Sequence, residues 1–319
     1  GGEGTRSDNV TIMEDGILTA PAAYSAPSAY YSPNAARMGG IEVLKGSSQI
    51  AHGPHTTGGV VNYLSTQFPT DHSFYLRSTY GSNSAFDIHG YWSDTSEGDF
   101  GNVGLLTEIY YRQTDGYRTI DAGNGYGGSD KTGFDLMEPM IKLYWEPNSD
   151  VYQRWEFKYG YTEFDADETY AGLTESDIAS NPYRRYAGTF LDNIQTEHTR
   201  TYLKYLVEPA DNLTLQVAAY YNEFERDWYK INKAGGQSVS KVVADPITYA
   251  AAFDDLRLLG TGSLGIKHNS RAYESKGVQF NFDYDTTIAG TEHNFTGGAR
   301  FHTDSIRRFQ QQDTIDLSN

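Results

Sequence analysis

The sequence predicts an all-β fold, a transmembrane antiparallel β-barrel, and three observations support this fold class. Apolar and polar residues alternate in about nine segments of roughly ten residues each. The links between these segments alternate between short turns and long loops. Aromatic residues make up 14% of the 319 residues and gather near the segment ends, as expected for strands whose outer face meets lipid.

Composition excludes several other classes of protein. Lys and Arg number 25 against 42 Asp and Glu, which gives a net charge of −17. Non-specific binding to nucleic acid phosphates is therefore disfavoured, and we expect no nucleic acid partner. The chain has no Cys, which excludes disulfides and thiol nucleophiles. No apolar run approaches the roughly 18 residues of a membrane-spanning helix.

The alternation separates two faces of each predicted strand. Trp155 and Phe157 alternate with Glu156 and Lys158, so side chains of opposite character point to opposite sides. The predicted strands are 72–81, 86–92, 102–112, 135–146, 155–162, 198–208, 213–221, 278–285 and 292–302. We expect Trp155, Phe157, Tyr159, Phe280, Phe282 and Tyr284 to face lipid, and Glu156, Lys158, Gln279, Asn281 and Asp283 to face the lumen.

The connections favour an up-and-down barrel. Short links rich in Gly, Pro, Asn and Asp occur at 94–101, 147–152, 209–212 and 287–291, whereas the links at 113–134, 163–197 and 226–272 are long. A strand of ten residues tilted near 45° rises about 23 Å, close to the apolar band of about 25 Å in an outer membrane. Two long loops contain predicted helices, one that begins at the capping box Thr174–Asp177 and one from Asp245-Pro246 to Gly260.

A soluble β-sandwich would also alternate, and two soluble or surface functions stay open at this point. The first is a secreted β-rich enzyme that acts on glycans, and the second is a surface adhesin. The many Tyr and Trp residues near strand ends favour the membrane barrel over both. The run Gly260–Gly265 matches a dinucleotide-binding pattern, but it follows a predicted helix where that motif requires a strand.

Residues 1–69 have a different character and carry a family resemblance. We expect a short strand at Val10–Met13, a turn at Glu14-Asp15-Gly16 and a small helix from Ser32-Pro33. Three motifs follow in order: Gly40-Ile41-Glu42-Val43-Leu44-Lys45-Gly46, Ala51-His52-Gly53-Pro54, and Gly58-Gly59-Val60-Val61-Asn62-Tyr63. In order and spacing they resemble the end of the plug domain of TonB-dependent outer-membrane receptors, with His52 where that family usually has Tyr.

The resemblance implies a domain organisation and a function. Residues 1–69 would be the C-terminal part of the plug, and 70–319 the N-terminal part of the barrel with extracellular loops 113–134, 163–197 and 226–272. Signal peptide, TonB box, the first half of the plug and the other strands of a barrel of about 22 would lie outside this chain, an internal fragment. Such receptors sit in the outer membrane of Gram-negative bacteria, surrounded by its lipid. They import a ferric chelate with energy from the TonB protein, they are not enzymes, and they carry iron as substrate without a cofactor.

Two sets of residues are candidates for function. Gly46, His52, Gly53, Pro54, Gly58, Gly59 and Asn62 form the plug motif, for which the residues themselves favour a structural role. Arg184, Arg185, Arg226 and Arg271 stand at loop bases of an acidic chain and could bind the carboxylates of an anionic ferric chelate, although pairing with nearby acids is the alternative. The loop from Tyr170 to Tyr186 resembles the iron(III) dicitrate receptor branch. No metal site and no catalytic triad is predicted.

Overall fold

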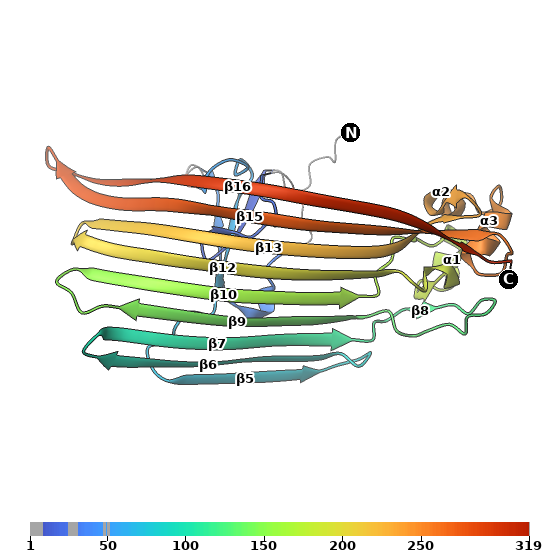
Figure 1. The fold of residues 1–319 in the computed structure, drawn as a ribbon, viewed down its shortest axis with the longest axis horizontal. Coiled ribbons are helices and arrows are strands. Elements are labelled where there is room, and N and C mark those ends of the chain that lie inside the picture. Colours follow the sequence, from blue (N-terminus) through green and yellow to red (C-terminus); the bar gives the residue numbers. More distant parts are fainter. Residues whose placement is uncertain (1–8, 25–30, 47–48, 50–51, 319) are drawn as a thin grey trace.

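The computed structural model describes residues 9–24, 31–46, 49 and 52–318, and one large antiparallel sheet dominates it (Figure 1). Its strands follow the order β5-β6-β7-β9-β10-β12-β13-β15-β16, so each long strand pairs with its neighbours in sequence. The nine predicted strands are therefore confirmed. Their bounds are Ser73–Tyr80 (β5), Phe86–Gly98 (β6), Gly101–Thr114 (β7), Phe134–Glu146 (β9), Tyr152–Ala166 (β10), Asn193–Ala210 (β12), Leu213–Ala234 (β13), Ser263–Ile288 (β15) and Thr291–Asp316 (β16).

The later strands are much longer than predicted. β5 has 8 residues, whereas β15 and β16 have 26 each. The predicted loop 226–272 is wrong at both ends, because β13 continues to Ala234 and β15 already begins at Ser263, which leaves a loop of 235–262. Outward positions there carry Glu225 and Asp227 in place of apolar residues. Alternation of apolar and polar residues therefore disappears in this part of β13, although the backbone stays extended.

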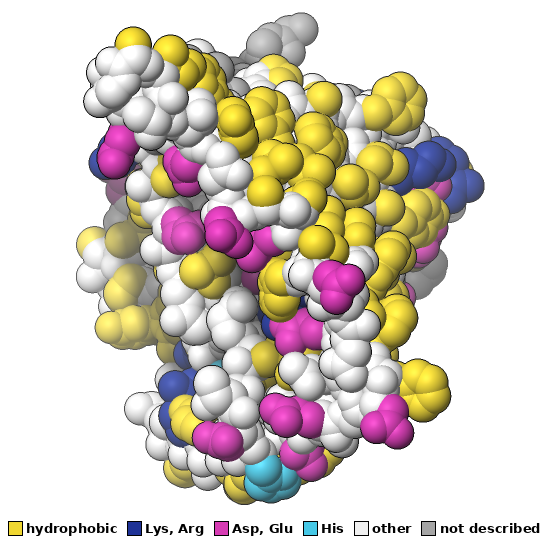
Figure 2. All heavy atoms as spheres, turned by 90° about the vertical axis from the view of Figure 1, so that its left-hand side faces the viewer, with side chains coloured by type: hydrophobic (Ala, Val, Ile, Leu, Met, Phe, Trp, Pro, Cys, Tyr) yellow, Lys and Arg dark blue, Asp and Glu magenta, His cyan; other side chains and the backbone are white. Residues whose placement is uncertain are grey.

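The two faces of the sheet agree with the predicted alternation. Trp155, Tyr159, Phe280 and Tyr284 are exposed on one face, whereas Lys158 and Gln279 are buried on the other. Figure 2, which looks at the end of the molecule with the short turns, shows hydrophobic side chains gathered on one side. We call the exposed apolar face outward and the opposite face inward.

Carboxylates occupy the outward face beyond the apolar part, toward the long loops. Glu163, Glu197 and Glu225 lie directly opposite one another on β10, β12 and β13. Asp135 and Asp165 form a similar pair on β9 and β10. Rows of like charge on adjacent strands repel one another, so these positions require contact with water.

A small four-stranded sheet of the order β2-β1-β4-β3 lies against the inward face, and we call residues 9–69 the plug segment (Figure 1). It contains β1 (Val10–Glu14), β2 (Ile17–Leu18), the 3-10 helix η1 (Ala35–Arg37), β3 (Met38–Leu44) and β4 (Gly59–Ser65). Ile17 packs with Tyr202, Ala218 and Tyr220 of the large sheet. The Asn222 amide donates to the carbonyl oxygen of Leu18 at 3.1 Å, so apolar and polar contacts both join the two sheets.

The long loops are ordered by short elements. Helix α1 (Glu175–Ser180) begins where predicted, because the Thr174 side chain accepts a hydrogen bond from the Asp177 amide. The second predicted helix is wrong in extent: α2 (Val239–Ala244) precedes Asp245, and α3 covers only Ala250–Leu256. The remaining elements are β8 (Thr119–Ile120), β11 (Arg184–Arg185), η3 (Ala187–Thr189) and β14 (Gln237–Ser238). Within the described residues, no helix is both long and apolar enough to cross a membrane.

Candidate functional site

A row of arginines crosses the inward face beyond the plug segment, and we call Arg226, Arg271 and Arg308 the arginine row. Arg226 of β13 lies opposite Arg271 of β15, which in turn lies opposite Arg308 of β16. The row continues through Thr196, Phe164 and Leu136 to Arg112 of β7. Like charges on directly opposed residues destabilise a sheet. The row therefore concentrates positive charge on one part of the inward wall.

Neighbouring polar and aromatic groups orient the arginine row. Nη2 of Arg226 donates to the carbonyl oxygen of Asn269 at 3.3 Å, and its guanidinium carbon lies 5.6 Å from the centre of the Trp228 ring. Nη1 of Arg271 lies 3.5 Å from the Tyr273 hydroxyl. Stacking on an aromatic face and a fixed hydrogen bond hold the planar guanidinium in one orientation.

Apolar side chains form the next row toward the loops. Ala166, Ile194 and Trp228 form a buried cluster, with Phe134 and Phe164 packed against it. Tyr170 from the loop after β10 stacks on Trp228 with ring centres 4.4 Å apart, and Nζ of Lys230 lies 3.7 Å from the centre of the Tyr170 ring. Cations and ring faces thus lie side by side at this end of the inward wall.

The structure brings only two of the four predicted arginines together. Arg226 and Arg271 are neighbours in the arginine row, whereas Arg184 and Arg185 lie in the loop between β10 and β12. Arg308, which is not among the predicted residues, completes the row. Alternation of apolar and polar residues indicates this strand only as far as residue 302, so it does not predict that β15 pairs with β16 up to Asp316.

Arg184 and Arg185 hold their loop together through contacts within the protein. The Arg184 guanidinium lies 2.6 Å from Oδ2 of Asp121 and 2.8 Å from Oδ1 of Asp177. Arg185 is buried and donates to the carbonyl oxygens of Asp167 and Thr189. Burial raises the pKa of Asp177, but hydrogen bonds from Tyr186 and Thr174 together with the Arg184 charge bring that pKa below its ordinary value. Direct contact with a chelate stays a prediction for both arginines.

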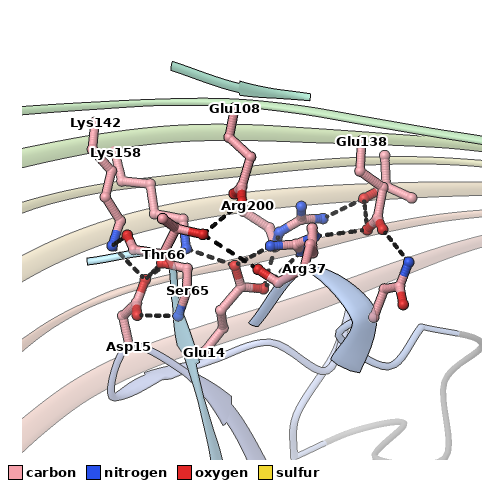
Figure 3. A network of polar contacts seen from close by, with 12 residues as sticks. Glu14, Asp15, Arg37, Ser65, Thr66, Glu108, Glu138, Lys142, Lys158 and Arg200 are labelled. Carbon is pink, nitrogen blue, oxygen red and sulfur yellow. Dashed lines mark hydrogen bonds and ion pairs between the residues drawn. The ribbon is translucent and has the colours of Figure 1, made fainter. Parts of the chain in front are cut away.

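A buried ion network joins the plug segment to the large sheet (Figure 3). Nζ of Lys158 lies 2.6 Å from Oε1 of Glu14 and 2.6 Å from Oδ2 of Asp15. Arg37 of the plug segment lies 3.2 Å from both Glu14 and the sheet residue Glu138. These five side chains are all at most 6% exposed, so the charges depend on one another and not on water.

The network extends along the sheet through Arg200, whose Nε lies 3.5 Å from Oε2 of Glu14. Gly160 on the neighbouring strand makes room for it, because a Cβ there would lie 3.2 Å from Nη2 of Arg200. Burial raises the pKa of Glu14, yet the charges of Arg37, Lys158 and Arg200 outweigh burial and hold that pKa well below its ordinary value. Breaking a buried pair by removing one partner costs about 3–5 kcal/mol.

The described residues of the plug motif make backbone turns and close contacts. Gly46, Gly53 and Gly59 have φ values of +80°, +91° and +129°, which side chains disfavour. A Cβ on Gly58 would lie 2.8 Å from the carbonyl oxygen of Asn9. Asn62 accepts from the Gly16 amide at 2.8 Å and donates to Glu42 at 2.8 Å.

His52 and Pro54, which flank Gly53, belong to a turn that touches β16. The carbonyl oxygen of His52 accepts from Nη1 of Arg300 at 3.0 Å. Pro54 itself is exposed. These contacts favour the structural role proposed for the motif. Among the described side chains, no three of His, Asp or Glu group in a way that could hold a metal ion.

No family model and no curated protein matches the chain, but solved structures do. The unliganded ferric citrate transporter FecA superposes with a TM-score of 0.70 at 17% identity, covering 98% of this chain and 41% of that one. The open form of the ferric-catecholate import receptor Fiu from E. coli K12 gives 0.67 at 15% identity, with 95% and 43% covered. The siderophore receptor PiuA from Acinetobacter baumannii gives 0.64 at 14% identity, with 95% and 39% covered.

The chain thus spans about two fifths of the length of these structures. At such low identities the similarity concerns the fold, and it agrees with the resemblance seen in the plug motif. The chain has the fold of these ferric-chelate receptors and transporters.

Proposed function

We propose that the complete protein is a TonB-dependent receptor of a Gram-negative outer membrane that imports an anionic ferric chelate. The arginine row is the observation that carries this proposal. It places three guanidinium groups on adjacent strands of the inward wall, where a solute that enters from the loops would meet them. On this proposal the protein makes and breaks no covalent bond, and iron is substrate and not cofactor.

The chemistry of the row fits a chelate with carboxylate or other negatively charged oxygen donors. A guanidinium binds such groups with two parallel hydrogen bonds. Each charge-assisted hydrogen bond contributes about 1.5–3 kcal/mol. Within the row Arg226 is only 1% exposed, Arg271 is half-buried and Arg308 is exposed. Electrostatic attraction is stronger at the buried end of the row. The similar structures include a ferric citrate transporter and a ferric-catecholate receptor, which supports an anionic chelate in general.

The plug segment supports the transport part of the proposal. It is joined to the inward wall by the buried ion network around Lys158, Glu14 and Arg37, so an unassisted opening would separate buried charges. An external source of energy is therefore required to move it. The resemblance to TonB-dependent receptors supplies the TonB protein as the partner that pulls on the plug.

The test is made in the complete receptor with Arg271→Ala, which removes the centre of the arginine row. We expect the affinity for ferric dicitrate to fall at least about tenfold, equivalent to about 1.4 kcal/mol, while affinity for a neutral ferric hydroxamate stays unchanged. Titration by intrinsic fluorescence measures both. Arg307→Ala is the matched control, because Arg307 lies next in sequence to Arg308 and points outward. Equal dicitrate binding by Arg271→Ala and wild type would overturn the proposal for this row.

A second variant tests the loop arginines. If Arg184 and Arg185 contact the chelate, replacing both with Ala lowers affinity for ferric dicitrate at least about tenfold and leaves the neutral chelate unaffected. Equal loss for both chelates shows instead that they act only by holding the loop, through Asp121 and Asp177.

A further inference from the structure

A second set of cations lies on the inward wall, closer to the loops than the arginine row. Lys230 of β13 lies directly opposite Lys267 of β15, and we call these two residues the lysine pair. Lys230 is four positions from Arg226 along β13, and Lys267 is four positions from Arg271 along β15. Because side chains alternate between the two faces of a strand, this even spacing keeps all four on the inward face, about 13 Å apart along each strand.

From the arginine row to the lysine pair, the described inward positions of β13, β15 and β16 carry no carboxylate. They are neutral or positively charged, although the whole chain has a net charge of −17. The acids of this region, Asp227 and Asp313, stand at outward positions of β13 and β16. An anion on this part of the wall would therefore be attracted by both rows of cations. The inward residues are Arg226, Trp228 and Lys230 on β13, Lys267, Asn269 and Arg271 on β15, and Arg308, Gln310 and Gln312 on β16.

The ammonium groups of the lysine pair are available to a ligand. Within the described residues, neither of them makes a hydrogen bond or an ion pair. Nζ of Lys230 instead lies 3.7 Å from the centre of the Tyr170 ring and 4.3 Å from that of the Trp228 ring, and these rings hold it in place without using its three N–H donors. Lys230 also lines a cleft of about 1040 Å³ between the loop after β10 and α2. Glu175 lines the same cleft, but it is exposed and forms no ion pair with Lys230.

The charges around Lys230 are mostly positive. Lys230 stands beyond the outward carboxylates, on the loop side of the membrane-spanning part. Burial and the positive charges of Lys267, Arg226 and Arg271 lower its pKa to about 8, and Asp192 is the one charged neighbour that opposes them. An anion bound here would reduce the repulsion among these cations and keep Lys230 ionised.

We propose that the lysine pair is a second anion-binding element of the chelate site, and that the substrate is a ferric chelate with separate anionic groups for the two rows. The arginine row holds one of these groups, and the ammonium groups of the lysine pair hold another. This inference rests on the proposed function and adds a property that arginines do not provide. Lys230 loses its charge in mildly alkaline water whereas an arginine stays charged, so binding of the chelate weakens as the pH rises.

The experiment titrates the complete receptor with ferric dicitrate between about pH 7 and pH 9, with intrinsic fluorescence as the readout. We expect the affinity of the wild type to fall at least about threefold over this range, as Lys230 loses its proton. Lys230→Arg keeps the charge and should bind with nearly constant affinity. Lys267→Gln removes a neighbouring positive charge, so binding should be weaker at pH 7 and the fall should move to higher pH. Lys241→Gln, at an exposed lysine of α2, is the matched control and should follow the wild type.

Equal pH profiles of the wild type and Lys230→Arg would overturn the second anion-binding element, because a change of the chelate itself with pH affects both proteins alike. Unchanged affinity of Lys230→Gln at pH 7, or an equal loss for a neutral ferric hydroxamate, would overturn it as well. If Arg271→Ala still loses affinity in those cases, the proposed function stands without the lysine pair. Absence of dicitrate binding by the wild type at every pH contradicts the proposed function and with it this inference. Resistance of the folded barrel to detergent on gels checks each variant.

Discussion

Lys158 joins the plug segment to the barrel wall with one side chain. Its ammonium contacts two carboxylates that are themselves buried, Glu14 and Asp15, and it also donates to the Ser65 hydroxyl at 3.1 Å. Buried charges of this kind are stable only as a set. A change at any member is therefore felt by the others.

Replacing Lys158 by Met should weaken the docking of the plug segment by about 3–5 kcal/mol, because Glu14 and Asp15 lose their shared partner. Hydrogen exchange of the β1 and β4 amides in the complete receptor measures the loss. Lys131→Met, at an exposed loop lysine, serves as control. Unchanged protection of β1 in Lys158→Met would show that the remaining cations suffice.

Asp192, at the end of the loop before β12, has a raised pKa that makes the stability of this loop depend on pH. Burial raises its pKa to about 6, although the Thr169 hydroxyl and the Ile231 amide, at 2.5 Å and 2.6 Å, stabilise the ionised form. A carboxyl with a raised pKa in the folded protein contributes stability that is fully present below its unfolded value, about 3.9, and is lost as the pH rises through about 6.

The loop that Asp192 anchors to β13 should consequently open more readily at pH 7 than at pH 4, by about 2 kcal/mol. Asp192→Asn keeps an acceptor for the Ile231 amide and should remove this pH dependence. Limited proteolysis between residues 167 and 192 across this pH range tests it. An equally steep pH dependence in the variant assigns the effect to another group.

At the scale of elements, the loop after β13 is built around one buried carboxylate. Asp255 of α3 accepts from the Gly262 amide at 2.9 Å. A Cβ on Gly260 or on Gly262 would overlap the Asp255 carboxylate. The glycines that resemble a nucleotide-binding pattern in the sequence thus wrap a side chain of their own loop.

Gly262→Ala should therefore destabilise the loop 235–262 by about 1–3 kcal/mol, since Asp255 must move to admit the methyl group. Faster hydrogen exchange of α2 and α3 reports it. Gly127→Ala is the control, because nothing lies within 4 Å of the added Cβ there. Equal exchange in both variants would mean that the loop adapts without cost.

Strand number, pairing order and the two faces were predictable because period-2 alternation survives wherever one face is apolar. The loop-side ends of β13 and β15 were not predictable, because their outward residues are polar and no longer differ in character from the inward residues. The arginine row was predictable only in part, because the sequence indicated Arg226 and Arg271 as candidates but not Arg308. Arg226 and Arg271 stand 45 positions apart, and their direct opposition depends on a register that a sequence does not display, with an irregularity between Ile231 and Lys233. The ion network was missed for the same reason, since Lys158 meets Glu14 only when the plug segment docks.

For the whole molecule, the described sheet ends at β5 and at β16, and neither end is paired with another described strand. The 26 residues of β16 then present a long edge that another chain can extend. The 319-residue chain expressed alone should therefore aggregate or require detergent, as light scattering would show. A monodisperse monomer without detergent that unfolds cooperatively would favour the soluble β-rich enzyme instead.

The opposed carboxylates Glu163, Glu197 and Glu225 determine how deeply the barrel sits in the membrane. Movement by two residues toward the turn side would carry a row of mutually repelling carboxylates toward hydrocarbon. Movement toward the loop side would lift the loop-side end of the apolar face, at Tyr159 and Tyr221, into water. Both displacements are unfavourable. The boundary between apolar residues and carboxylates on the outward face thus fixes the depth of the barrel in the membrane. The arginine row is therefore held at a constant height relative to the bilayer, and movement of the plug segment does not change that height.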